Sequence, residues 1–158
     1  MSPREMKFMQ AAIDLSRQGM HEGQGGPFGC IIVKNDVIVG KGCNCVTTYN
    51  DPTAHAEIVA IRDACKSLNH FQLTDCELYT SCEPCPMCLG AIYWARPSVM
   101  YFANTRKDAT AIGFDDSFIY DELNVPIRER AIQTIRLEIP DALKVFEEWA
   151  QKPNKTVY

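Results

Sequence analysis

The sequence predicts an α/β fold, a three-layer α/β/α sandwich with a central mixed five-stranded sheet. Short apolar runs bounded by turn residues alternate with stretches in which apolar residues recur at helical spacing. This alternation is typical of helices packed on one sheet. The chain has 158 residues, 46% hydrophobic and 23% charged, which is an ordinary globular composition. We therefore expect a single domain over residues 1–158.

The N-terminal part predicts one helix and one β-hairpin. Residues 3–19 have apolar side chains at helical spacing, and Gly19 marks the end of that helix. The apolar run Phe28–Val33 is followed by a turn at Asn35 and Asp36, and Val37–Val39 then continues the pattern. Two such runs around a turn indicate a hairpin.

The middle of the chain predicts two helices and two strands. Residues 54–67 have a helical pattern preceded by Thr53, which we expect to be the N-cap. Glu77–Thr80 and Val99–Ala103 are candidate strands. Between them, a helix begins near Pro86 and continues to about residue 95, because proline is well tolerated in a first helical turn.

The last third is less regular. Residues 108–124 predict helical pieces interrupted by Gly113. Ala131–Ile139 is expected to form the last strand or an extended segment, and Asp141–Gln151 a helix with one apolar face.

Charge and cysteine content restrict the function classes. The net charge is −4 and the basic residues form no stripe, which argues against a polynucleotide substrate. We find no signal-peptide pattern and no run long enough to span a bilayer, so we expect a cytoplasmic protein. Of the eight cysteines, we expect six to be small buried apolar residues.

Two short motifs predict a catalytic zinc site with one Zn²⁺ per subunit. His55, Cys85 and Cys88 are three candidate ligands, which leaves a fourth tetrahedral position for water. Glu57, two residues after His55, is placed to carry protons. The arrangement matches the H-x-E and P-C-x-x-C signature of zinc-dependent base deaminases. A structural zinc site remains an alternative, with Cys82 or Cys45 as the fourth ligand.

Over nearly its whole length the chain resembles the cytidine-deaminase-like superfamily of zinc deaminases, and within it the bacterial guanine deaminases. The run from Asp51 to Glu57 is shared with tRNA adenosine deaminases, so it does not discriminate between these groups. The segment from Gly113 to Tyr120 and the terminal Tyr158 are the discriminating features.

The resemblance implies that guanine is hydrolysed to xanthine and ammonia in purine catabolism or salvage. It implies that Glu57 and Asp116 are the two catalytic proton carriers. It also implies a homodimer in which a C-terminal segment, roughly residues 125–158, is exchanged between subunits. The substrate-binding residues that it implies are Asn44, Phe28, Ala56, Trp94 and Tyr158.

Other interpretations of these residues stay open at this point. Asn44 could satisfy a turn, Phe28 and Trp94 could be core residues, and Asp115 with Asp116 could cap a helix, Asp115 being the better candidate for the cap. The alternative functions are guanosine deamination, tRNA adenosine deamination, cytosine or cytidine deamination, and a structural zinc module.

Overall fold

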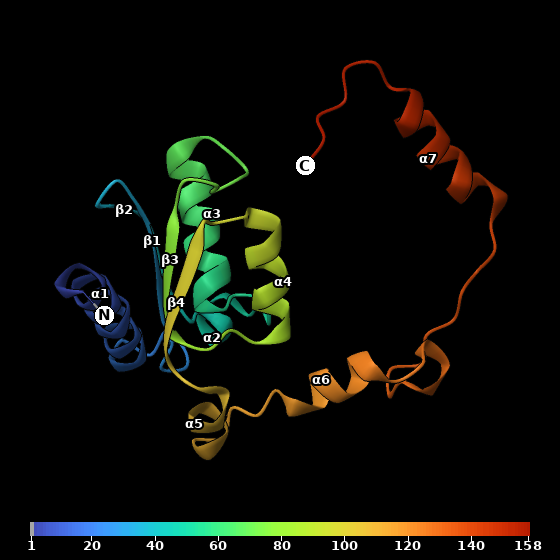
Figure 1. Ribbon diagram of the computed structural model, residues 1–158. Coiled ribbons are helices and arrows are strands. Elements are labelled where there is room, and N and C mark those ends of the chain that lie inside the picture. Colours follow the sequence, from blue (N-terminus) through green and yellow to red (C-terminus); the bar gives the residue numbers. More distant parts are fainter. Residues whose placement is uncertain (1) are drawn as a thin grey trace. The chain divides into compact units, whose positions relative to one another are not determined.

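A mixed sheet of four strands forms the centre of the first part of the chain in the computed structural model, which describes residues 2–158 (Figure 1). The strand order is β2-β1-β3-β4. β1 is antiparallel to both of its neighbours, whereas β3 and β4 are parallel. The strands are β1 Gly29–Lys34, β2 Val37–Cys43, β3 Glu77–Cys82 and β4 Val99–Asn104.

Seven helices accompany the sheet in residues 2–158. They are α1 Pro3–His21, α2 Val46–Tyr49, α3 Ala56–Leu68, α4 Pro86–Ala95, α5 Arg106–Ala111, α6 Ser117–Asn124 and α7 Pro140–Gln151, with a 3-10 turn, η1, at Ile127–Glu129. The chain divides into two compact units at Ser117. No helix within residues 2–158 combines the length and the hydropathy needed to cross a membrane.

Helices cover both faces of the sheet in the first unit, as the sequence predicts. α1 lies on one face, and α3 and α4 lie on the other (Figure 1). Alternate residues of β1 pack on opposite faces of the sheet, because successive strand residues point in opposite directions. Ile31 and Val33 pack with Phe8 of α1, whereas Cys30 and Ile32 belong to the core cluster that includes α3.

Two glycines allow α3 to approach β2 closely. A Cβ at Gly42 would lie 2.2 Å from the Ala56 carbonyl oxygen, and one at Gly40 would lie 2.6 Å from that of Ala60. Both distances are far shorter than a normal van der Waals contact, so any larger residue would push the helix outward. The start of α3, which follows His55, is therefore seated directly on the sheet.

The predicted N-cap of α3 is wrong by two residues. His55, not Thr53, is the N-cap. Thr53 is engaged elsewhere, because its backbone N–H and its hydroxyl both donate to Asp51 Oδ1, at 2.8 and 2.7 Å. Asp51 thus closes an Asx turn before the helix, which competes with capping. The helix itself and the other predicted elements of the first unit lie within a few residues of their expected positions.

The sheet of residues 2–158 has four strands and does not include the predicted fifth strand. Residues 131–139 belong to the second unit and have no strand partner within residues 2–158. Their apolar side chains are strongly exposed, with Ile132 at 81% and Leu137 at 75%. Ile135, Leu137 and Ile139 alternate as in a strand, but a strand also needs a neighbouring strand for its backbone groups. The helix predicted after this segment is confirmed as α7.

Candidate active site

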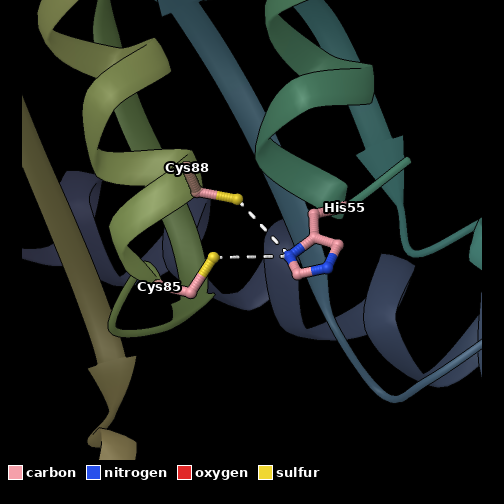
Figure 2. Close-up of side chains that lie close together, drawn as sticks. All are labelled: His55, Cys85 and Cys88. Carbon is pink, nitrogen blue, oxygen red and sulfur yellow. Dashed lines mark hydrogen bonds between the residues drawn. The ribbon is translucent and has the colours of Figure 1, made fainter. Parts of the chain in front are cut away.

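Two helix N-termini bring the candidate metal ligands together. His55 is the N-cap of α3 and Cys85 is the N-cap of α4, and neither side chain makes a capping hydrogen bond. Pro86 occupies the first turn of α4, where its missing N–H is not needed. Cys88 follows in that turn and is buried. The side chains of His55, Cys85 and Cys88 point toward one another (Figure 2).

The spacing of these three donor atoms fits zinc. His55 Nδ1 lies 3.6 Å from Cys85 Sγ and 3.5 Å from Cys88 Sγ, as sulfur–nitrogen contacts (Figure 2). With bonds of about 2.3 Å to sulfur and about 2.05 Å to nitrogen, a tetrahedral zinc ion requires a separation of about 3.6 Å. Two thiols and an imidazole are also the donor types that zinc prefers.

The electrostatics of Cys85 and Cys88 favour a thiolate at this site. A hydrogen bond from Cys88, followed by one involving His55, lowers the pKa of Cys85 to about 4 despite its partial burial. The hydrogen bond with Cys85 and burial raise the pKa of Cys88 above its usual range. One of the two sulfurs is therefore anionic near neutral pH, and thiolate is the form that binds a metal.

Within residues 2–158 the cluster has three members, which leaves one tetrahedral position without a protein ligand. The two candidates for a closed four-ligand site have other partners. Cys82 Sγ donates to the Thr105 carbonyl, and Cys45 Sγ faces Cys43. The other non-ligand cysteines agree with their expected role, since Cys30 and Cys76 are buried, while Cys43 and Cys65 are partly buried.

Glu57 lies in the first turn of α3 and is only 6% exposed. Burial raises the pKa of its carboxyl, and this is opposed by hydrogen bonds to the carboxylate, including one from Thr80. Thr80 Oγ1 donates to Glu57 Oε1 at 2.8 Å. This bond fixes the position of one carboxylate oxygen. A buried carboxylate with a raised pKa is suited to general base and acid work.

Asn44 is buried beside a glycine turn, and its amide orientation is defined. Its Oδ1 accepts hydrogen bonds from the backbone N–H groups of Gly26 and Val46, at 3.2 and 3.3 Å. Because the oxygen faces these two donors, Nδ2 lies on the other side of the amide. The asparagine therefore satisfies a turn, as one interpretation of the sequence expected, and it also presents a hydrogen-bond donor.

Phe28 is half-buried and meets the ring of Phe114 edge to face, with centroids 4.9 Å apart and planes at 88°. Gly26 lies under this pair, since a Cβ there would be 2.8 Å from Phe114 Cζ. Gly113, with φ at +92°, makes the turn that presents Phe114. The segment that begins at Gly113 is thereby held against the loop around Phe28.

Asp116 follows this segment and is partly buried. Burial and then the negative charge of Cys85 raise the pKa of Asp116, so its carboxyl lies within electrostatic reach of the metal ligands. Asp115 has a different task, because its Oδ1 accepts the backbone N–H of Ser117 at 2.9 Å. Asp115 is thus the residue that supports the start of α6, as the sequence suggested.

The remaining predicted site residues are less directly placed. Ala56 is fully buried at the start of α3, and Trp94 on α4 is 64% exposed. Tyr158 belongs to the second compact unit, which includes residues 118–158. Substrate contacts of these three residues stay predictions.

Sequence reasoning missed two residues, Thr80 and Phe114. Thr80 is a hydroxyl on the strand face that also carries Leu78, and a buried polar residue among apolar ones signals a buried partner. Phe114 stands inside the segment that carried the family resemblance, yet its spacing gives no indication of its contact with Phe28.

Comparison with known proteins agrees with this geometry. The family model for the cytidine and deoxycytidylate deaminase zinc-binding region matches residues 2–104. A guanine deaminase from Bacillus subtilis (strain 168) is 53% identical over 151 residues, covering 96% of this chain and 97% of the relative. A tRNA-specific adenosine deaminase from Aquifex aeolicus (strain VF5) is 32% identical over 146 residues, covering 92% and 93%.

A solved structure shows the same likeness. The X-ray structure of guanine deaminase from Bacillus subtilis superposes with a TM-score of 0.95 at 51% sequence identity, covering 100% of this chain and 99% of that one.

Proposed function

The chain belongs to the family of cytidine and deoxycytidylate deaminases that share a zinc-binding region, and we propose that it hydrolyses guanine to xanthine and ammonia. The observation that carries this proposal is the convergence of His55, Cys85 and Cys88 beside the buried Glu57. The choice of guanine is supported by the Bacillus subtilis guanine deaminase, which matches 96% of this chain at 53% identity.

The chemistry divides between the metal site and two carboxylates. His55, Cys85 and Cys88 would hold Zn²⁺, which lowers the pKa of a bound water and so makes a nucleophile available near neutral pH. Glu57, whose Oε1 accepts a hydrogen bond from Thr80, takes a proton from the attacking water and delivers it to a ring nitrogen next to C2. Asp116 then carries the remaining hydroxyl proton to the amine, which leaves as ammonia while the carbonyl forms at C2.

Two carboxyl groups suit this sequence of proton transfers because they lie in different surroundings. Glu57 is enclosed and bonded to Thr80, whereas Asp116 is only partly buried. Paired carboxylates in unequal environments can carry out acid and base steps at one site. The presence of Glu57 and Asp116 favours a hydrolytic enzyme over a structural zinc module, because a structural site does not require buried proton carriers.

Asn44, Phe28 and Phe114 supply a pocket for the purine. The Nδ2 donor of Asn44 pairs with an acceptor, such as the carbonyl oxygen or a ring nitrogen of guanine, and not with the exocyclic amine of adenine. Phe28 stacks on the base, and Phe114 supports its ring from the edge. We propose that Ala56, Trp94 and Tyr158 complete the contacts.

We further propose a homodimer in which residues from about 125 to 158 are exchanged. The exposed apolar residues of segment 131–139 and of α7, including Phe146 at 74%, need a surface to cover them. β4 pairs with β3 alone within residues 2–158, so its other edge can accept a strand. A segment 131–139 from the second copy would make the fifth strand. A particle of twice the chain mass in analytical ultracentrifugation is expected, and a monomer at micromolar concentration contradicts the exchange.

We place the reaction in purine catabolism in the cytoplasm. All eight cysteines are free thiols in the structure, which is typical of proteins in reducing compartments.

The deciding experiment measures ammonia release from guanine, guanosine, adenine, cytosine, cytidine and an unmodified tRNA, before and after removal of metal by a chelator. We expect activity on guanine that is lost with the metal and restored by Zn²⁺. Zinc-loaded protein that is silent on guanine refutes the proposal, and activity on guanosine or on tRNA adenosine identifies which alternative replaces it. The Glu57→Gln variant, with its zinc retained, controls for a contaminating enzyme.

A further inference from the structure

Two cysteines that are not zinc ligands flank Asn44. Cys43 is the last residue of β2, and Cys45 immediately precedes α2. Their sulfurs lie 3.7 Å apart, and Cys45 Sγ also lies 3.4 Å from the Cys43 carbonyl oxygen. The two thiols thus face each other across one residue, and that residue carries the amide assigned to the substrate.

The backbone around Asn44 is in close contact with the neighbouring segments. A Cβ at Gly25 would lie 2.3 Å from Asn44 Oδ1, so the glycine turn is in close contact with the amide. The backbone N–H of Asn44 donates to the Phe28 carbonyl at 3.0 Å. The N–H of Cys45 donates to the Ala54 carbonyl at 2.9 Å, next to the metal ligand His55. A shift of the backbone at either cysteine is therefore transmitted to the site.

We propose that Cys43 and Cys45 form a reversible oxidation site, in which hydrogen peroxide joins them as a disulfide that displaces Asn44. The disulfide stands on the thiol geometry alone, and its effect on activity rests on the proposed function of Asn44. Cys43 is the more exposed thiol, and although burial raises its pKa to about 11, its sulfur attacks the peroxide oxygen, which gives a sulfenic acid and one water. Cys45 sulfur then attacks Cys43 sulfur, and the hydroxyl leaves with the thiol proton as a second water.

The geometry favours this bond over other modifications. A disulfide needs the sulfurs to approach from 3.7 Å to about 2.05 Å, which side-chain rotation and a small backbone shift provide. Gly19 of α1 closes one side of Cys43, because a Cβ there would lie 2.9 Å from the sulfur, so a bulky adduct has less space. A bridge across one intervening residue is strained and is therefore readily reduced.

The test combines peptide mass with enzyme kinetics on the zinc-loaded protein. Trypsin releases Gly42–Arg62, which contains both thiols and no other cysteine, whereas Cys85 and Cys88 lie in the peptide that begins at Ser67. After treatment with hydrogen peroxide, we expect peptide 42–62 to lose two hydrogen atoms. We also expect KM for guanine to rise by up to about tenfold, the effect of one lost hydrogen bond, and dithiothreitol to restore it.

Three variants separate this site from damage at the metal. Cys43→Ser and Cys45→Ser should keep the untreated activity and lose both the mass change and the dithiothreitol-reversible rise in KM. Cys82→Ser, a buried cysteine outside the pair, should respond as the natural chain does. Oxidation of the zinc-binding cysteines Cys85 and Cys88 would appear in the other peptide and in zinc content, and it would persist in all three variants.

The outcomes that overturn the proposal are direct. If the mass of peptide 42–62 is unchanged after peroxide treatment, the proposed oxidation site is refuted. If the disulfide forms but KM is unchanged, the proposed effect on Asn44 is refuted. Because the mass of the peptide does not depend on guanine turnover, failure of the proposed function is recognised separately.

Discussion

The hydrogen bond between Thr80 and Glu57 offers a sharp test of the proton-carrier role. Thr80→Val replaces the hydroxyl by a methyl group of similar size at a position that is 1% exposed. The bond from Thr80 to Glu57 Oε1, 2.8 Å long, is lost while the strand keeps its packing. Since this bond lowers the pKa of Glu57, its removal should raise that pKa further.

A hydrogen bond to a charged group contributes about 1.5–3 kcal/mol. At about 1.36 kcal/mol per pKa unit, the loss corresponds to a rise of roughly one to two units. Glu57 must be ionised to accept the water proton, so the acid limb of kcat/KM for guanine should move to higher pH by that amount. Activity on the plateau should change much less, because the ionised base is still present there.

The assay is the pH dependence of guanine turnover, with zinc content measured for each sample. Ser81→Ala is the matched control, since Ser81 is the adjacent buried hydroxyl and accepts the backbone N–H of Gly29 at 3.0 Å instead. This control should lose stability without a shift of the acid limb. If Thr80→Val leaves the limb in place, or if both variants move it equally, Glu57 is not the titrating base that the structure indicates.

Three further predictions follow from individual contacts. Asp116→Asn should lower kcat by about 10²-fold, as is typical of a lost proton carrier, with zinc content retained; unchanged turnover would end its assignment. Glu77→Gln should melt at a lower temperature than the natural chain at pH 7, because the ion pair with Arg4 lowers the pKa of Glu77 and so stabilises the fold. This stabilisation is present above the unfolded pKa of Glu77 and is lost as the pH falls through the lowered folded pKa. The difference in Tm should therefore shrink as the pH falls below the ordinary pKa of a glutamate, and a constant difference would contradict it. Gly42→Ala should lower both stability and zinc affinity by displacing the first turn of α3, whereas Gly40→Ala, one turn further along, should lower stability alone, as thermal melts and metal titration can show.

The metal ligands could be predicted from the sequence because each is marked by local features. His55 and Cys85 are both N-caps, and Pro86 identifies the start of α4 without any tertiary information. Cys88 follows within the same helical turn, so its spacing from Cys85 already determines that the two sulfurs share a side. Glu57 is equally local, two residues after His55. Only the meeting of the two helices needed the structure.

The contacts that tune the site could not be predicted in this way because they join distant segments. Thr80 and Glu57 are 23 residues apart and meet only because α3 and β3 contribute to the same core cluster. Phe114 reaches Phe28 through a turn at Gly113, whose positive φ has no periodic signature. The Cys43 and Cys45 thiols were recognisable as neighbours in sequence, but their facing orientation depends on how β2 ends.

The fifth strand shows a different limit of sequence analysis. The alternation of Ile135, Leu137 and Ile139 indicates that one side of segment 131–139 should be buried, but not against which chain. Fully burying each isoleucine or leucine gains roughly 1.5–3 kcal/mol, and four such residues are exposed there, from Ile132 at 81% to Ile139 at 59%. A segment that leaves this much apolar area in water gains nothing from strand formation alone, since its backbone groups would remain unpaired. The prediction of a strand and its absence from the isolated chain are therefore consistent if a second copy supplies the missing edge, and the five-stranded sheet is then a property of the proposed dimer instead of the chain.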